Sequence, residues 1–157
     1  MTRLSVLLAT AFGLGRLPIA PATWASAATA AAIWLWLPVQ PGLEVTLLLL
    51  LSPVAVWSAH RAEKQLGHDA HPIVIDEVLG QGIALLAVPR EPGWILAAFL
   101  LFRFFDIVKP LGVGALQRLP GGWGIVADDV AAGILARLVL WAAVAWGPQA
   151  ARWAGLG

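Results

Sequence analysis

Five of the nine acidic residues lie in three short motifs, each a few residues inside one end of an otherwise apolar segment. The motifs are Asp76-Glu77, Asp106 and Asp128-Asp129. A carboxylate in such a position is costly to remove from water, so it is usually retained for a site rather than for the fold. Two cations, Arg103 and Lys109, lie close in sequence to the second motif. Acids grouped with cations predict divalent-metal chemistry on an anionic substrate.

The composition is typical of an integral membrane protein. Hydrophobic residues make up 60% of the 157 residues and charged residues only 12%, about half the charged fraction of a soluble domain. We therefore predict an all-α fold in one domain, residues 1–157, built as a polytopic membrane helical bundle. The net charge of +1 is uninformative about nucleic acid, but the sequence has no basic run, and we expect no nucleic-acid partner. The absence of cysteine excludes disulfides, thiolate zinc sites and a cysteine nucleophile.

Five apolar segments predict about four to five helices in this bundle. Two of the connections, Pro38–Gly42 and Pro89–Gly93, are tight loops rich in proline and glycine, which break helices. The segments are Thr23–Leu37, Leu43–Ala59, Pro72–Val88, Gly93–Pro110 and Gly124–Trp146. The first is short for a full crossing, which takes about 20 residues, so a re-entrant or internally packed helix is the alternative there. Before them, Met1–Phe12 predicts a retained helix that lies at the membrane surface.

The distribution of lysine and arginine between the loops predicts the topology. Arg3, Arg16, Arg61, Lys64, Lys109 and Arg118 fall on one side, and Arg90 and Arg152 on the other. By the positive-inside rule, the N-terminus and the loops His60–His71 and Lys109–Gly122 lie in the cytoplasm, and five crossings place the C-terminus outside. Under this topology four segments converge on the cytoplasmic face: Gly13–Thr23, His71–Glu77, Arg103–Pro110 and Gly121–Asp129. Asp76, Asp106 and Asp128 then lie at similar depth, which predicts one site facing the cytoplasm.

The paired acids indicate a hard metal ion. Adjacent residues on a helix are about 100° apart, so one member of each pair can bind metal while the other faces a neighbouring helix. Carboxylate oxygens suit Mg²⁺, which keeps several waters and completes its shell with phosphate. For Asp76 and Glu77 the alternative is a solvated pair that is favoured by the helix dipole. We expect the metal ligands to come from Asp76, Glu77, Asp106, Asp128 and Asp129.

Cations beside Asp106 are candidates for binding phosphate. Arg103 and Asp106 share one helical face at i, i+3, which fits either an intrahelical ion pair or a phosphate-binding arginine beside a metal-binding aspartate. Lys109 adds a second cation at headgroup level. We predict catalytic roles for Arg103, Asp106, Lys109 and Asp128.

Two segments rich in glycine or proline are candidates for contact with the substrate. Gly121 and Gly122 precede an apolar helix, where glycine lets backbone N–H groups approach an anion and the helix N-terminus adds a favourable field. The segment Gly13–Thr23 predicts a rigid lid with one cation, Arg16. We expect Arg16, Thr23, Gly121 and Gly122 to bind substrate; for Thr23 the alternative is capping of the helix that follows.

Four segments, taken in order, resemble the phosphatidylglycerophosphatase A family over most of the chain. They are Gly13-x-Gly15-x-x-Pro18-x-x-Pro21-x-Thr23, Ile73-Val74-Ile75-Asp76-Glu77, Phe102-Arg103-x-x-Asp106-x-x-Lys109-Pro110 and Gly121-Gly122-x-Gly124-Ile125-x-x-Asp128-Asp129-x-x-Ala132-Gly133. The last two are specific, and the shared order argues against coincidence. The resemblance implies a Mg²⁺-dependent enzyme of the bacterial cytoplasmic (inner) membrane. Its reaction would be hydrolysis of phosphatidylglycerophosphate, a phospholipid substrate, to phosphatidylglycerol and phosphate in phospholipid biosynthesis.

Several alternatives stay open at this point. Mg²⁺ would neutralise phosphoryl oxygens and orient a water for attack, or Asp106 or Asp128 would attack and form an aspartyl phosphate. The three histidines, His60, His68 and His71, are candidates to protonate a leaving group, and a solvated loop is the alternative for them. A small ion or proton pathway would also use intramembrane carboxylates. Such a pathway needs a row of acids across the membrane, whereas these acids gather at one face. A purely structural subunit leaves the acids unexplained.

Overall fold

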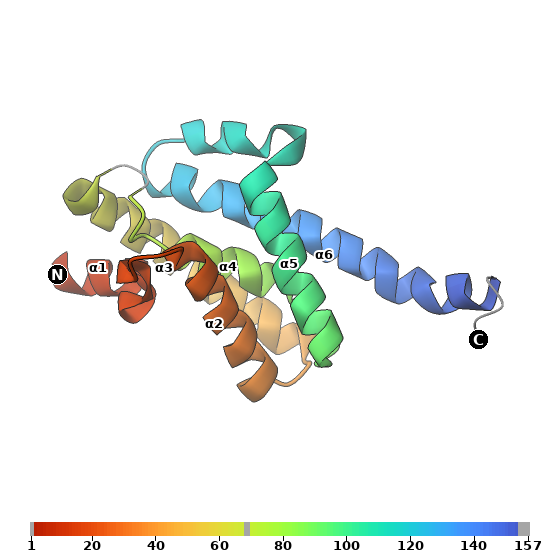
Figure 1. The fold of residues 1–157 in the computed structure, drawn as a ribbon. Helices are drawn as coiled ribbons and strands as arrows, with labels where there is room; N and C mark the ends of the chain where they lie inside the picture. The colour runs from red at the N-terminus through yellow and green to blue at the C-terminus, as the bar shows by residue number, and fades with distance from the viewer. Residues whose placement is uncertain (1, 68–69, 154–157) are drawn as a thin grey trace.

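The computed structural model describes residues 2–67 and 70–153, with side chains for 3–67 and 70–146, and every regular element in these residues is helical (Figure 1). The elements are α1 (Thr2–Ala9), the 3₁₀ helix η1 (Ala11–Arg16), α2 (Pro21–Trp36), α3 (Pro41–Leu66), α4 (Ile75–Ala84), α5 (Pro92–Val108), the 3₁₀ helix η2 (Pro110–Arg118) and α6 (Gly122–Trp153). The all-α fold expected from the sequence is therefore confirmed.

Proline sets the starts of three helices. Pro21, Pro41 and Pro92 occupy the first turns of α2, α3 and α5. Proline lacks the N–H group that a first turn leaves unpaired, and its fixed φ is already suited to a helix. The two breaker-rich loops, Pro38–Gly42 and Pro89–Gly93, accordingly lead into α3 and α5.

The short helix α4 lies at the centre of the bundle. It packs against α2, α3, α5 and α6, and most extensively against α6. Eight of its ten residues are buried. Glycine allows the close approach to α6: a Cβ on Gly80 would lie 2.6 Å from the Asp129 carbonyl oxygen, and one on Gly133 would overlap the Gly80 backbone. These small surfaces bring α6 and its aspartates next to the acidic end of α4.

An apolar core beside α4 joins α1, α3 and α6. Ala9, Ala59, Leu79 and Ile125 are among its buried members, one from each of these helices and α4. The N-terminal segment that we expected to be helical forms α1, which packs along α3. Its position at a membrane surface stays a prediction.

Helix α4 is much shorter than the apolar segment Pro72–Val88, from which we expected a membrane crossing. Its ten residues give a length of about 15 Å, half the hydrocarbon thickness of a bilayer. Residues 85–91 continue from it without a helix. Because four other helices pack against α4, the irregular backbone that follows it can be accommodated in a membrane, where non-helical backbone is tolerated if it is buried in protein. Helix α4 is therefore shorter than α2, which covers the segment Thr23–Leu37 up to Trp36 and whose sixteen residues are themselves fewer than the about 20 of a full crossing.

Among the described residues, α3 is the helix that has both the length and the hydropathy of a membrane span, with 26 residues. One such helix also occurs in the cores of soluble proteins, so the four to five apolar helices that we expected to cross a membrane stay a prediction.

A buried ion pair that the sequence did not reveal fastens the bundle at the other end of α4. Arg90 Nη2 lies 2.8 Å from Glu44 Oε1, and Glu44 Oε2 accepts the backbone N–H of Ala87 at 2.7 Å. The Arg90 guanidinium also donates to three backbone carbonyl oxygens of the adjoining connections. These bonds tie the α2–α3 loop to the α4–α5 connection and so hold α4 in place.

Candidate active site

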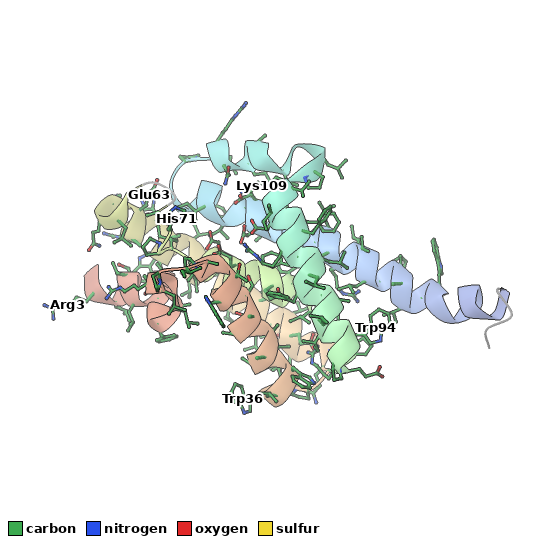
Figure 2. All side chains as sticks on the ribbon, viewed as in Figure 1. Arg3, Trp36, Glu63, His71, Trp94 and Lys109 are labelled. Carbon is green, nitrogen blue, oxygen red and sulfur yellow. The ribbon has the colours of Figure 1, made fainter. Side chains whose placement is uncertain are left out.

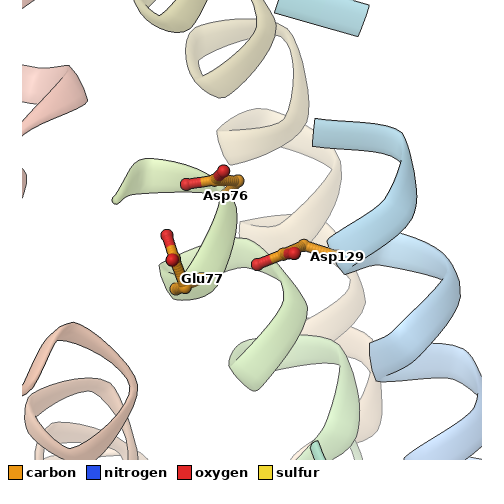
Figure 3. Close-up of side chains that lie close together, drawn as sticks. All are labelled: Asp76, Glu77 and Asp129. Atoms are coloured by element: carbon orange, nitrogen blue, oxygen red, sulfur yellow. The ribbon is translucent and has the colours of Figure 1, made fainter. Parts of the chain in front are cut away.

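Three carboxylates from two helices meet at the start of α4 (Figure 3). Asp76 and Glu77 belong to the first turn of α4, and Asp129 lies on α6. One oxygen of each carboxylate lies within 4.8 Å of one oxygen of each of the others. The three residues are only 6%, 9% and 4% exposed. The fold therefore gathers acids that are far apart in the sequence into one nearly buried group.

The three carboxylates suit a hard divalent cation. Asp76 Oδ1, Glu77 Oε2 and Asp129 Oδ2 are buried and have no hydrogen-bond partner among the described residues. A buried charge without a partner is costly, and carboxylates this close repel one another. An ion that prefers oxygen ligands removes both penalties at once, because it pairs with all three oxygens. The residues present therefore fit a site for such an ion.

The other two acids of the motifs face cations. Arg103 Nη1 lies 2.6 Å from Asp106 Oδ2, and the Lys109 ammonium group pairs with Asp128 Oδ2. The intrahelical ion pair that we considered for Arg103 and Asp106 is therefore present. Asp106 and Asp128 do not belong to the three-carboxylate group; the sequence named all five acids as candidate ligands and left open which of them bind the metal directly. Adjacent side chains on a helix diverge by about 100°, and here Asp129 joins the cluster while Asp128 pairs with Lys109. Asp76 and Glu77 are adjacent as well, but both belong to the cluster, so the expected division of roles holds for the second pair only.

The charge balance of the site is negative. Its five carboxylates and two cations leave 2 − 5 = −3 when all are ionised. The charges of Glu77, Asp106 and Asp128 all act unfavourably on Asp129. An anionic phosphate would be repelled by this field, so phosphate binding here requires added positive charge, which a divalent cation provides.

A polar cavity of about 280 Å³ adjoins the carboxylates. Thr23, His71, Asp76, Glu77 and Arg103 line it. The start of α2, the segment before α4 and the last turns of α5 thus contribute to one cavity, as the sequence predicted for these three segments. In the view of Figure 2, His71 and Lys109 lie toward the same end of the bundle, away from Trp36 and Trp94.

Arg16 and Thr23, both expected to bind substrate, take different positions. Thr23 lines the cavity, whereas Arg16 is exposed at the end of η1 and does not line it. The alternative role of Thr23 as a helix cap is wrong. Helix α2 begins at Pro21, and Ala20 occupies the capping position without a side-chain hydrogen bond. The proline places the helix start two residues before the hydroxyl.

Gly121 and Gly122 pack against α3 and do not line the cavity. A Cβ on Gly121 would overlap the His60 imidazole, and one on Gly122 would overlap the Val56 carbonyl oxygen. The need for glycine at these positions is therefore explained by the contact between α3 and the start of α6. Their expected contact with substrate stays a prediction.

The three histidines, which the sequence treated alike, occupy different places. His71 lines the cavity, His60 packs against Gly121, and His68 lies outside the described residues, as does Asp69. The feature that distinguishes His71 is its position directly before Pro72, in the segment that leads into the acids of α4.

Comparison with known proteins matches most of the chain. The family model described as Phosphatidylglycerophosphatase A matches residues 7–144. An Escherichia coli protein named phosphatidylglycerophosphatase A is 36% identical over 139 residues, which cover 86% of this chain and 80% of the relative. A Haemophilus influenzae protein of the same name is 41% identical over 146 residues, covering 89% and 88%.

A further relative has a different name. A Bacteroides thetaiotaomicron protein, provisionally named a phosphatidylinositol-3-phosphatase, is 42% identical over 146 residues, which cover 87% of this chain and 91% of the relative. No solved structure shows a significant match to the chain. The names of all three relatives share one chemistry, removal of a phosphate from a phospholipid headgroup.

Proposed function

The chain belongs to the phosphatidylglycerophosphatase A family, and from this premise we propose that it hydrolyses phosphatidylglycerophosphate to phosphatidylglycerol and phosphate. The reaction would belong to phospholipid biosynthesis, and the enzyme would use Mg²⁺ as its cofactor. The observation that carries the proposal is the group of three carboxylates beside a polar cavity that Arg103 also lines. An ion pathway is not favoured, because the acids gather at one end of the bundle.

Apolar side chains on the outside of the bundle support a location in the membrane. Leu50 on α3 is 63% exposed, Ile107 on α5 is 70% exposed and Leu138 on α6 is 55% exposed. Soluble proteins rarely expose large apolar surfaces, whereas lipid tails accept them. Together with the loop charges, this supports a protein of the bacterial inner membrane whose site faces the cytoplasm. In this arrangement α4 is held inside a bundle of spanning helices.

Asp76, Glu77 and Asp129 would hold the Mg²⁺ ion. Their buried, unpaired oxygens provide the oxygen ligands that this ion prefers. When bound, the ion supplies positive charge that neutralises phosphoryl oxygens and helps to orient the reacting groups. Its charge also offsets the net negative field that would otherwise repel the substrate.

Arg103 is placed to bind the phosphoryl group. It lines the cavity, and Asp106 engages its Nη1 atom, which orients the planar guanidinium. Its Nε atom is buried without a partner among the described residues. The remaining N–H groups are then available to phosphoryl oxygens, whose charge they stabilise as the P–O bond breaks. Lys109 pairs with Asp128 and does not line the cavity. It would contribute a positive charge at the level of the lipid headgroups.

Hydrolysis by water is the route that we favour. A water oxygen forms a bond to phosphorus while the bond to the glycerol oxygen breaks; the glycerol oxygen takes up a proton from a donor, and one of the two water protons replaces it on that donor while the other stays on the released phosphate. His71 lines the cavity and is the described histidine placed to donate this proton. The rival route has Asp106 or Asp128 attack phosphorus first. Both carboxylates are held in ion pairs, which lowers their nucleophilicity and favours the water route.

The proposal is tested by measuring phosphate release from purified full-length protein in detergent. We expect release from phosphatidylglycerophosphate in the presence of Mg²⁺ and none after chelation with EDTA. Phosphatidylinositol 3-phosphate and phosphatidic acid serve as comparison substrates, and both should have a lower kcat/KM. A higher kcat/KM for phosphatidylinositol 3-phosphate would identify that lipid as the preferred substrate in place of phosphatidylglycerophosphate. No turnover of any of the three lipids with any divalent metal would overturn the enzyme assignment.

The absence of cysteine makes the proposed sidedness directly testable. Single variants Glu91→Cys and Arg118→Cys introduce thiols at exposed positions beside the start of α5 and at the end of η2. In spheroplasts, a membrane-impermeant maleimide should label position 91, and it should label position 118 only after the membrane is permeabilised. Equal labelling of both positions in sealed spheroplasts would contradict the proposed crossing by α5.

A further inference from the structure

Gln81 is a buried polar residue that the proposed chemistry does not yet use. It is 0% exposed, and neither Nε2 nor Oε1 of its amide has a hydrogen-bond partner among the described residues. An amide in an apolar core without partners destabilises a protein, because it loses its hydrogen bonds to water and gains none in return. A leucine or methionine of similar size would avoid this penalty. The amide group therefore requires an explanation other than packing.

The position of Gln81 directs it toward the carboxylate group. It lies four residues after Glu77 on α4, so the two side chains share one helical face. Side chains on a helix point back toward its N-terminus, so Gln81 leans over the turn that carries Glu77. Glu77 Oε2 is itself buried without a partner. An unpaired amide donor thus lies one helical turn after an unpaired carboxylate acceptor, on the same face of α4.

We propose that Gln81 is a positioning residue for Glu77, an inference that rests on the metal site of the proposed function. In the metal-bound protein its Nε2–H group donates to the Glu77 carboxylate, directly or through one buried water, and holds that carboxylate in the orientation that binds the ion. A neutral amide suits this task, because it restrains the carboxylate without neutralising the charge that the metal requires. Partners of this kind, beyond the direct ligands, typically change metal affinity about 10–100-fold.

The substitution Gln81→Met separates this role from a structural one. Methionine keeps the length and the unbranched shape of glutamine but removes the amide. Since the amide is unpaired in the protein without metal, the variant should melt at the same temperature as the parent or higher when EDTA is present. Its response to Mg²⁺ should be weaker, with the midpoint of the MgCl₂-induced rise in Tm moving to about 10–100-fold higher concentration.

The experiment is a MgCl₂ titration of Tm for the full chain in detergent, which needs no turnover. Gln65→Met is the matched control, because Gln65 is an exposed glutamine near the end of α3 whose amide donates to the Arg61 carbonyl oxygen. It should leave the Mg²⁺ midpoint unchanged. The parent protein should show the Mg²⁺-induced rise; if it shows none, the metal site of the proposed function fails, and this inference fails with it.

Two results would overturn the role of Gln81 alone while the metal site stands. One is a Gln81→Met protein with the same Mg²⁺ midpoint as the parent. The other is a variant that melts at a lower temperature in EDTA or does not fold, since this would show that the amide stabilises the core. A shifted midpoint with an undiminished Tm in EDTA supports the proposal.

Discussion

Replacing Asp129 by Asn is expected to lower Mg²⁺-dependent phosphate release by about 10³-fold or more, because the metal contributes several kcal/mol to stabilising the transition-state charge. Asp129 provides one of the three clustered oxygens, and asparagine offers a neutral oxygen in its place. The protein should still fold, since the change removes a buried carboxylate oxygen that has no partner. Initial rates at saturating substrate over a range of MgCl₂ concentrations, together with Tm in EDTA, test both statements.

The adjacent residue gives this experiment a matched control. Asp128→Asn makes the same chemical change one position away, but Asp128 pairs with Lys109 instead of joining the cluster. We expect a smaller loss of rate and an unchanged dependence on MgCl₂. Glu91→Gln, at an exposed position before α5, should behave like the parent. If Asp128→Asn altered the MgCl₂ dependence and Asp129→Asn did not, the assignment of the two aspartates would have to be exchanged.

Some of the site could be predicted from the sequence because proline and glycine fix where the helices end. Pro72 and Pro110 stand next to the ends of α4 and α5, and Asp76 and Asp106 each lie about one turn from these prolines. The loop charges then assign those ends to one face. This reasoning predicted that Thr23, Asp76 and Arg103 would approach one another, and all three line one cavity.

The pairing of the acids could not be predicted, because depth along a helix says nothing about rotation around its axis. By depth, Asp128 was grouped with Asp76 and Asp106. In the structure Asp129 is the residue that approaches α4, because Gly80 and Gly133 allow the two backbones to touch at that face. A pair of glycines in sequence does not reveal which helix they will contact, so the choice between two adjacent aspartates depends on tertiary packing.

The length of α4 and the Glu44–Arg90 ion pair also could not be predicted from the sequence. An apolar run predicts burial, but it does not distinguish a spanning helix from a short helix that is buried on all sides. Glu44 and Arg90 are 46 residues apart, and each resembles an ordinary loop or helix-end charge. Their contact depends on α4 being short enough to leave an irregular connection, whose backbone groups they bind.

A comparison of Arg103→Lys with Lys109→Arg separates chemistry from binding. Arg103 lines the cavity. Its planar guanidinium group holds several N–H donors in a fixed arrangement, which the flexible side chain of lysine cannot reproduce. We expect Arg103→Lys to lower kcat, corresponding to about 2–4 kcal/mol if it acts like other preorganised donors to transition-state charge. Lys109 is held by Asp128 outside the cavity lining. Lys109→Arg keeps the charge and should mainly raise KM.

The ion pairs make this comparison informative. Each substitution preserves a cation opposite its aspartate, so simple loss of the Arg103–Asp106 or Lys109–Asp128 pair is not the variable being tested. What changes is the geometry of the donors that face the substrate. Steady-state kinetics with phosphatidylglycerophosphate at fixed MgCl₂ should therefore give different kinetic signatures, a fall in kcat for Arg103→Lys and a rise in KM for Lys109→Arg. If both variants instead changed KM alone, Arg103 would be better assigned as the structural partner of Asp106, and the phosphoryl-binding role would pass to another group of the cavity.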